Sequence, residues 1–485
     1  MNVMDSPSIG PGGAPAPVRG PLRAQRGSRG VRPAPHVMAK PAGPTCNMEC
    51  TYCFYLDKQA LFPRSSLRMT PEVVRAVLQD AIDASPDTAI QFCWQGGEPT
   101  LRGLDFYREA FAVARRIVPP GRHFAWSMQT NGVLIDERWA EFLARHDVLV
   151  GLSIDGPRDV HDRWRVDRGG RGTWAKVMRA ARLLHEHGVR FNTFTTVHPA
   201  NQHRGAEVYR FLRDEVGSDF HQYIPIVVPD PARPGHVVRG LSVDPGAWGE
   251  FQVDVFSQWL HRDVGQVFVM NVEWALAAWC GDEPASCMFR EHCGDAVVVE
   301  HDGSVYSCDH FVDPAHRLGR VGDDSLAAMV ADPRQRTFGD AKADLPARCR
   351  ECPVLFACHG ECPKNRLMGE AQLMGEARLM GEAQLAGEAQ LAGEARLMGE
   401  AQLTGEDRLT GEDRLTRGPR SEGADPMAGP ADGPKVNYLC RGYRHFFTAI
   451  DAPMRYLAAC VLSGRDPARV MPWARQYRIL VSPGT

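Results

Sequence analysis

The sequence Cys46-Asn-Met-Glu-Cys50-Thr-Tyr-Cys53 places three cysteines at C-x3-C-x2-C spacing. Three thiolates at this spacing can ligate three irons of a [4Fe–4S] cluster and leave the fourth iron open to another ligand. A zinc site or a chance grouping is the alternative interpretation. The array therefore predicts an iron–sulfur site with one open coordination position.

The residues from about His36 to Val228 alternate between short β-rich runs and helical patterns. Strands are expected at residues 89–94, 123–128, 148–154, 191–197 and 221–228. Several are nearly continuous in apolar or β-branched residues, which is typical of strands buried on both faces of a parallel sheet. Helices are expected at Thr70-Pro71 and beyond, at 139–145 and at 174–187. We predict an α/β fold that forms a barrel or part of one.

Glycine-rich and polar segments follow several of these strands. Gln95-Gly96-Gly97-Glu98-Pro99 follows the strand at 89–94, and Gln129–Gly132 and Ser153–Pro157 end later strands. Barrels of this class place their active-site loops at these strand ends. Taken alone, each segment is also compatible with an ordinary turn.

Together, the cysteine array and the Gly-Gly-Glu-Pro segment resemble the radical S-adenosylmethionine (SAM) superfamily. The resemblance implies a partial (β/α)6 TIM-like barrel and a cluster whose open iron binds SAM. It also implies SAM contacts from Tyr52, Gly97, Glu98, Ser153 and Arg165. For Ser153 and Arg165, a turn cap and a surface arginine are the alternatives.

A second group of cysteines lies towards the C-terminus. It comprises Cys287, Cys293, Cys308, Cys349, Cys352, Cys358, Cys362 and Cys440. Their layout resembles the small Cys-rich SPASM domain, which carries two auxiliary [4Fe–4S] clusters. The resemblance implies that Cys287, Cys293, Cys308 and Cys362 hold cluster one, and that Cys349, Cys352, Cys358 and Cys440 hold cluster two. A zinc ribbon is the alternative for Cys349–Cys362. Cys93, Cys280 and Cys460 are expected to be buried thiols.

Within this superfamily the chain resembles the anaerobic sulfatase-maturating enzymes, over residues 37–366 and 438–456. The shared segments are Met38–Pro41, Cys53–Leu56, His161–Arg165, Gln222–Pro225 and Ser307–His310. The resemblance implies oxidation of a cysteine or serine in a Cys/Ser-x-Pro-x-Arg motif of a sulfatase to Cα-formylglycine. It also implies an electron-donor protein such as flavodoxin or ferredoxin.

Asp309 is the expected catalytic base. It follows the cluster ligand Cys308 directly, so proton and electron removal would take place close together. A hydrogen-bond acceptor beside the cluster or a solvated loop aspartate is the alternative. Tyr55 is a weaker candidate for the substrate pocket and is also compatible with core packing.

Two rival functions remain open on the sequence. A maturase that forms thioether or carbon–carbon links in a ribosomally made peptide would share the cluster motifs. Asp309 and the Met38–Pro41 segment favour sulfatase maturation, as does the lack of an N-terminal winged-helix pattern. A redox-sensing iron–sulfur protein would need neither an open-iron triad nor a Gly-Gly-Glu-Pro segment.

Composition sets the remaining expectations. The 485-residue chain has a net charge of -3, which indicates neither a nucleic-acid nor a membrane surface. It contains no apolar run of membrane-spanning length and no apolar export signal, so we expect a cytoplasmic protein. The expected divisions are a disordered arm (1–35), the radical SAM core (36–240), a helical bridge with the SPASM domain (241–366), a repeat insert (367–434) and the SPASM completion with a C-terminal helix (435–485).

The insert opens with eight hexads, from Leu367-Met-Gly-Glu-Ala-Gln372 to Leu409-Thr-Gly-Glu-Asp-Arg414. A six-residue period advances a helix by about 240°, so the leucines cannot share one helix face. A hexapeptide β-helix is conceivable, but Glu, Ala and Gln are poor strand residues. We therefore predict a flexible insert.

Overall fold

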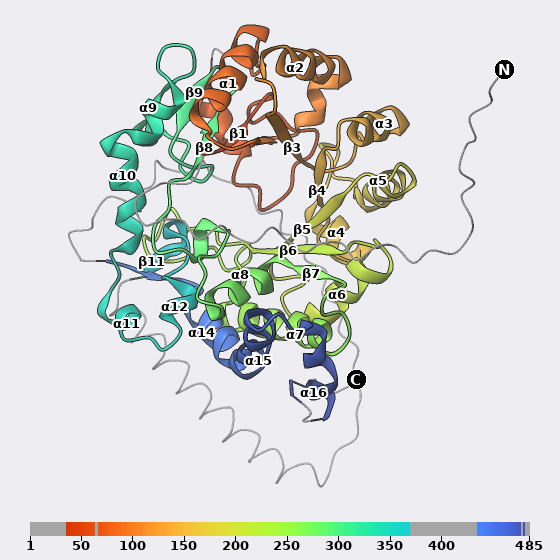
Figure 1. Cartoon of the computed structure of the whole chain (residues 1–485), viewed down its shortest axis with the longest axis vertical. Coiled ribbons are helices and arrows are strands. Elements are labelled where there is room, and N and C mark those ends of the chain that lie inside the picture. Colours follow the sequence, from red (N-terminus) through yellow and green to blue (C-terminus); the bar gives the residue numbers. More distant parts are fainter. Residues whose placement is uncertain (1–34, 64–65, 369–433, 477–478, 481–485) are drawn as a thin grey trace, which may run out of the picture.

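Six strands run parallel in chain order through the centre of a ten-stranded sheet (Figure 1). They are β1 (His36–Ala39), β2 (Ala89–Trp94), β3 (His123–Thr130), β4 (Leu149–Ser153), β5 (Phe191–Val197) and β6 (Phe220–Pro225). The computed structural model describes residues 35–63, 66–368, 434–476 and 479–480. The sheet stays open, because β1 pairs with β8 on its outer side and the two-residue β7 (Phe268–Val269) pairs with β6. The predicted partial (β/α)6 barrel is confirmed.

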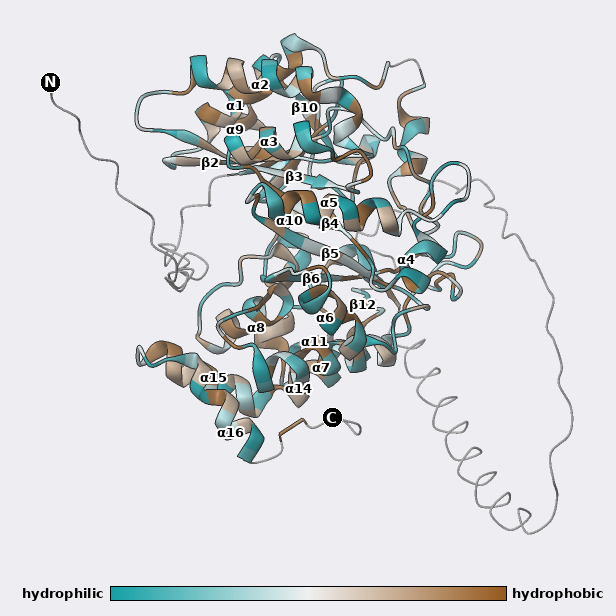
Figure 2. Ribbon diagram, turned by 90° about the vertical axis from the view of Figure 1, so that its right-hand side faces the viewer, coloured by the Kyte–Doolittle hydropathy of each residue, from teal (hydrophilic) through white to brown (hydrophobic). Residues whose placement is uncertain are grey.

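Helices connect the parallel strands and cover the outside of the sheet. They are α1 (Pro71–Ala84), α2 (Gly103–Ile117), α3 (Glu137–Arg145), α4 (Arg158–Trp164), α5 (Trp174–Glu186), α6 (Gly205–Asp214) and α7 (Pro245–Arg262). Both hydrophilic and hydrophobic residues occur within helices such as α5 and α6 (Figure 2), which is the pattern of helices that bury one face. None of the helices in the described ranges is long and apolar enough to cross a membrane.

The sequence at the start of α1 explains why the helix begins at Pro71. The Thr70 hydroxyl accepts a hydrogen bond from the Val73 amide at 3.4 Å, and Pro71 takes the first helical position. Proline fits there because its missing N–H would have no partner in the helix. The helix buries Val73, Val74, Val77 and Leu78 against the sheet, as their periodicity predicts.

Strand β1 was not among the expected strands, and its pairing decides where the site lies. Val37 pairs with Phe92 of β2 on one side and with Val297 of β8 (Ala296–Val299) on the other. Four residues suffice for this strand because both of its edges are occupied. Strand β9 (Ser304–Tyr306) pairs antiparallel with β8, and β10 (Arg317–Arg320) pairs antiparallel with β9. The sheet therefore continues from the barrel into the Cys-rich region.

Most of the C-terminal part lies below β6 and β7 in the view of Figure 1, and the rest lies beside β8 and β9. It contains α8 (Met270–Trp279), α9 (Leu326–Ala331), α10 (Pro333–Asp340), α11 (Ala347–Arg350), α12 (Leu355–Cys358), α14 (Cys440–Ala449), α15 (Asp451–Leu462) and α16 (Val470–Gln476). Helices α7 and α14 come very close, because a Cβ atom at Gly442 would lie 2.1 Å from the Pro245 carbonyl oxygen. This contact fixes α14, whose first residue is Cys440.

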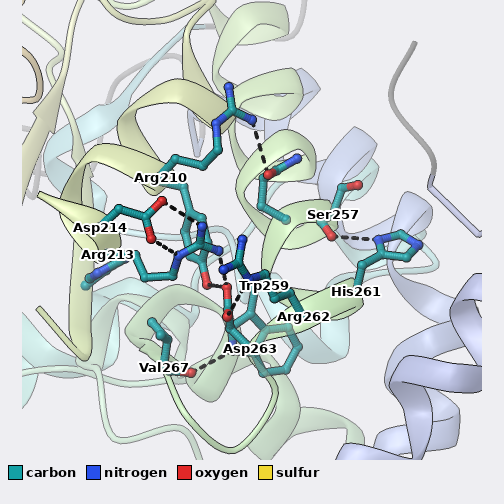
Figure 3. A network of polar contacts seen from close by, with 12 residues as sticks. Arg210, Arg213, Asp214, Ser257, Trp259, His261, Arg262, Asp263 and Val267 are labelled. Atoms are coloured by element: carbon teal, nitrogen blue, oxygen red, sulfur yellow. Dashed lines mark hydrogen bonds and ion pairs between the residues drawn. The ribbon is translucent and has the colours of Figure 1, made fainter. Parts of the chain in front are cut away.

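A buried polar network ties α6 to the end of α7 (Figure 3). Asp263 accepts hydrogen bonds from the Tyr209 hydroxyl and from Arg213, each at 2.7 Å. Arg213 also binds Asp214 on its own helix, and the Trp259 indole donates to the Val267 carbonyl at 2.7 Å. The network holds together α6 and α7, the two helices that precede and follow β6. Its residues do not lie at the carboxyl ends of the strands, where the site is found.

The two ends of the repeat insert lie side by side, in a pair of short strands. Strands β11 (Arg366–Met368) and β12 (Val436–Asn437) pair antiparallel, with Met368 opposite Val436. The first residues assigned to the insert, Leu367 and Met368, are thus part of the fold. The predicted flexibility of 369–433 and of the N-terminal arm concerns residues outside the described ones.

Replacing residues 369–433 with Asn-Gly is expected to leave the iron content unchanged, because β11 and β12 already hold the two chain ends together. Shortening the loop to about four residues should raise the free energy of unfolding by roughly 2 kcal/mol. Urea unfolding and iron analysis of the reconstituted proteins measure both effects. Loss of about four irons per chain would show that the insert itself is needed for a cluster.

Candidate active site and cluster-binding cysteines

The first cysteine triad lies in the loop that follows β1. Cys46, Cys50 and Cys53 are half-buried, and the Cys53 amide donates to the Cys50 carbonyl at 3.0 Å. Burial, the nearby Glu98 and the other two thiols raise the pKa of Cys46 to about 12. Burial raises the pKa of Cys50 to about 11. Such thiols become thiolates when a metal binds them, so the triad fits a cluster with three protein ligands.

A second set of cysteines surrounds a cavity of about 610 Å³. The four cysteines that line it are Cys349, Cys352, Cys358 and Cys440. Burial and the Cys440 thiol raise the pKa of Cys349 to about 11, and the same two causes raise the pKa of Cys358. Four thiols around one cavity fit a cluster with no open iron.

The third set is centred on Cys287. Burial and the Cys287 thiol raise the pKa of Cys293 to about 12. Burial also raises the pKa of Cys308, to which the thiols of Cys362 and Cys287 contribute. Thiols of each set thus lie near one another, and the partition into two sets of four cluster ligands stays a prediction. Of the remaining cysteines, Cys460 is buried as expected, whereas Cys93 and Cys280 are only half-buried.

The Gly-Gly-Glu-Pro segment packs directly against the start of the triad loop. The Gly97 amide donates to the Gly43 carbonyl at 2.8 Å, and the Glu98 amide donates to the Thr45 carbonyl at 2.9 Å. A Cβ atom at Gly97 would lie 2.1 Å from the Thr45 carbonyl oxygen, which no side chain can satisfy without a backbone shift. Glycine is therefore required at 97 by its contact with the residue that precedes Cys46.

A Gly97→Ala substitution is expected to displace the triad loop and to cost about 1–3 kcal/mol of folding free energy, as overpacked sites do. Both the thermal unfolding midpoint and the rate of SAM cleavage should fall. Gly240→Ala is the matched control, because nothing lies within 4 Å of a Cβ atom there. Equal unfolding midpoints for the two variants would contradict the packing argument.

The Glu98 side chain connects the triad loop to the ends of two strands through hydrogen bonds. Its buried carboxylate accepts hydrogen bonds from the Thr100 amide at 3.0 Å, the Thr130 hydroxyl at 2.7 Å and the Asn131 amide at 2.8 Å. Burial raises the pKa of Glu98, and these hydrogen bonds act in the opposite direction. Asn131 in turn donates to Asn47 at 2.8 Å. The carboxylate thus joins the ends of β2 and β3 to the loop that carries Cys46.

Tyr52, Asp155 and Arg165 form a buried network beside Cys50. The Tyr52 hydroxyl donates to Asp155 at 2.6 Å and accepts from Arg165 at 2.7 Å. Arg165 is only 7% exposed, which rules out the surface-arginine alternative. Its Nε atom has no hydrogen-bond partner among the described residues, so one donor is left for a further group. Ser153, at the end of β4, accepts from Gln129 at 3.0 Å.

Asp309 lies in a second polar group at the carboxyl ends of β1, β2 and β8. Lys40 donates to one of its carboxylate oxygens, and Gln95 donates to the other at 3.1 Å. Both Lys40 and Asp309 are buried, which rules out a solvated loop aspartate. Burial would raise the pKa of Asp309, but the charges of Lys40 and His310 hold it below its usual value. Asp309 is thus a buried carboxylate with both oxygens held.

Tyr55 and Phe54 flank this carboxylate. Tyr55 is buried, its hydroxyl donates to Glu300, and the Lys40 ammonium lies 4.3 Å from its ring centroid. Such a contact stabilises the cation. Phe54 is 40% exposed, and its ring lies 5.5 Å from that of His310. Tyr55 therefore belongs to the wall of the site, and Phe54 to its exposed side.

Sequence reasoning did not single out Lys40 or Gln95 as site residues. Each directly follows a parallel strand, β1 or β2, and this position was the available signal. Their meeting with Asp309 depends on the pairing of β1 with β8, which joins segments about 260 residues apart. No local pattern reports such a pairing.

Comparisons with known proteins assign the family. Residues 41–212 match the radical SAM superfamily, and residues 287–353 match the iron-sulfur cluster-binding domain SPASM. A serine-type anaerobic sulfatase-maturating enzyme of Bacteroides thetaiotaomicron is 32% identical over 90% of this chain and 94% of its own length. A cysteine-type enzyme of Clostridium novyi is 29% identical over 68% of this chain and 88% of its own.

A solved structure, native anSMEcpe with bound AdoMet and Kp18Cys peptide, superposes with a TM-score of 0.70. It is 26% identical and covers 87% of this chain and 99% of that one. These relatives support neither the peptide-maturase nor the redox-sensor alternative. The chain therefore belongs to the anaerobic sulfatase-maturating enzymes, radical SAM enzymes with a SPASM domain that use SAM and three [4Fe–4S] clusters.

Proposed function

We propose that this chain oxidises a cysteine or serine in a Cys/Ser-x-Pro-x-Arg motif of a sulfatase to Cα-formylglycine, with Asp309 as the proton acceptor. The observation that carries the proposal is the position of Asp309. It is peptide-bonded to Cys308 of the Cys287 set, and Lys40 and Gln95 link it to the strand ends that flank the first triad.

We assign the first triad to the SAM-binding cluster, the Cys287 set to auxiliary cluster one and the Cys349 set to auxiliary cluster two. When bound by these residues, SAM and its cluster would supply hydrogen-atom abstraction at the substrate Cβ, and the auxiliary clusters would supply a one-electron acceptor. The chain's own task is then to remove one proton from the substrate thiol or hydroxyl. Asp309 is the acceptor for that proton.

The neighbours of Asp309 fix its orientation. Lys40 and Gln95 each hold one carboxylate oxygen, so the carboxylate cannot rotate freely. Lone pairs that these donors leave free remain available to the substrate proton. Because Asp309 follows Cys308 in the chain, proton and electron leave the substrate on the same side. A cysteine substrate then needs hydrolysis of the thioaldehyde, whereas a serine substrate gives the aldehyde directly.

The residues around the first cysteine triad are the proposed SAM contacts. Arg165 offers the unpaired Nε atom, and Tyr52 and Ser153 lie on the same side of the strand ends. Gly97 packs against the backbone that precedes Cys46, so its own backbone lies close to the proposed cluster site. Glu98 would contribute through its backbone, because its carboxylate is already held by three neighbouring groups.

The cellular compartment and the electron donor are part of the same proposal. Unpaired cysteines that serve as cluster ligands suit a reducing cytoplasm, where a flavodoxin or ferredoxin can supply electrons. The domain divisions at residues 36–240, 241–366 and 435–485 also stay predictions.

Incubation of the anaerobically reconstituted protein with SAM, dithionite and a Cys-x-Pro-x-Arg or Ser-x-Pro-x-Arg peptide tests the function. We expect 5′-deoxyadenosine together with a mass loss of about 18 Da from the cysteine peptide, or about 2 Da from the serine peptide, through chemistry that the cofactor drives. The two peptides also decide which residue is accepted. Deoxyadenosine without conversion of either peptide would overturn the substrate assignment.

A further inference from the structure

Two buried cations lie among the cysteines of the auxiliary sets. Lys342, in the short helical turn Ala341–Ala343, is fully buried, and Arg366, at the start of β11, is 7% exposed. Neither forms an ion pair with a carboxylate among the residues that the structure describes. Buried cations of this kind are rare, because a charge without a counter-charge is costly to remove from water.

Lys342 reaches into the loop of the Cys287 set. Its ammonium donates to the carbonyl of Arg290, which lies midway between Cys287 and Cys293. Helix α10 ends against the same loop, because a Cβ atom at Gly339 would lie 2.2 Å from the Cys293 carbonyl oxygen. The positive charge of Lys342 lowers the thiol pKa of both cysteines, against the larger effect of burial.

Arg366 lies between the two auxiliary sets. Its guanidinium donates to the carbonyls of Lys342 at 2.8 Å, and of His359 and Gly360 at 3.3 Å. His359 and Gly360 belong to the three-residue loop from Cys358 to Cys362, which joins one set to the other. Arg366 interacts electrostatically with thiols of both sets, and Lys342 interacts with Cys287, Cys293 and Cys362 of the first.

The missing counter-charge is on the clusters. Four thiolates around an oxidised [4Fe–4S] core give a net charge of about −2, and reduction adds one negative charge. A fixed buried cation stabilises the reduced form more than the oxidised form, so it raises the reduction potential. Cations also lie beside cluster two, where Arg348 and Arg444 line the cavity and lower the pKa of Cys440. Arg290 is paired with Asp295 at 2.8 Å, and the buried Glu361 affects Cys358 and Cys362, one of each set.

We propose that Lys342 is a positioning residue that raises the reduction potential of auxiliary cluster one. A higher potential would make cluster one a better acceptor for the single electron that the proposed reaction releases. The inference rests on the proposed function for the identity of the substrate, but the effect on potential does not require a substrate.

The test is a reductive titration, monitored by electron paramagnetic resonance, of the full-length reconstituted protein. The Cys46→Ala/Cys50→Ala/Cys53→Ala background leaves only the auxiliary signals. Lys342→Gln and Lys342→Met should lower one of the two midpoint potentials and leave the other in place, whereas Lys342→Arg should change neither. Lys364→Gln is the matched control, because Lys364 also lies near Cys362 but is only half-buried. The midpoint potential should shift less in Lys364→Gln, since water screens the charge of Lys364.

Unchanged potentials in both neutral variants would overturn the proposal, as would equal shifts of both clusters or an equal shift in Lys364→Gln. If the neutral variants fail to take up cluster one while Lys342→Arg binds it fully, the counter-charge role is supported. Loss of the cluster from all three variants would indicate a purely steric role and overturn it. Shifted potentials in an enzyme that converts no peptide would leave this inference standing and remove the proposed substrate.

Discussion

Asp309→Asn is expected to lower the rate of formylglycine formation by about 10²–10⁴-fold, the usual contribution of a general base. Asparagine has nearly the same shape and can still bind Lys40 through its carbonyl oxygen, but its amide cannot accept the substrate proton. All three clusters should remain, because Asp309 is not assigned as a ligand. SAM cleavage should therefore continue, and 5′-deoxyadenosine should accumulate without aldehyde.

The measurement compares aldehyde and deoxyadenosine yields in the same reaction by mass spectrometry. Asp323→Asn is the matched control, because its side chain is 66% exposed and forms an ion pair with Arg320 at 3.7 Å. Its two yields should equal those of the unmodified enzyme. If Asp309→Asn converts the peptide at the unmodified rate, Asp309 is not the base.

Replacing Cys46, Cys50 and Cys53 together by alanine is expected to abolish SAM cleavage altogether. The iron content should fall from about twelve to about eight atoms per chain, because only the auxiliary clusters remain. These thiols have no assigned role in folding besides ligation, so the far-ultraviolet circular dichroism should stay the same. Iron analysis and deoxyadenosine yield measure the two effects.

Cys352→Ala provides the contrast, because Cys352 lines the cavity assigned to cluster two. That variant should still cleave SAM, while peptide conversion falls. A triad variant that still releases deoxyadenosine would contradict the assignment of the open-iron cluster. Loss of SAM cleavage in Cys352→Ala would show that the clusters do not have separate roles.

The parallel strands that sequence patterns predict well are those whose buried residues alternate over six or seven positions. β2 and β5 occupy the expected residues, because continuous apolar or alternating runs of six or seven residues identify them. β1 is too short to give such a signal, and β8–β10 lie among cysteines whose spacing dominates the sequence. Their assembly into one sheet is a long-range event that local propensity does not encode.

The residues of the site also differ in whether the sequence predicts them. The cysteine ligands were predictable because thiolate chemistry imposes short spacings on the chain. The Lys40–Asp309–Gln95 group was not, because it forms only when β8 pairs with β1. Arg165 shows the same limit: its motif suggested a role, but its burial beside Tyr52 and Asp155 depends on how α4 packs. Buried charges such as Lys342 carry no sequence signature at all.

The central claim is that a radical formed at the first triad removes a hydrogen atom from the Cβ of a sulfatase residue. A peptide substrate with two deuterium atoms on that Cβ tests the claim most directly. One deuterium should appear in the 5′-deoxyadenosine and the other should stay on the aldehyde carbon, in equal amounts. Aldehyde formation with no deuterium in the deoxyadenosine, or deuterium transfer without aldehyde, would contradict it.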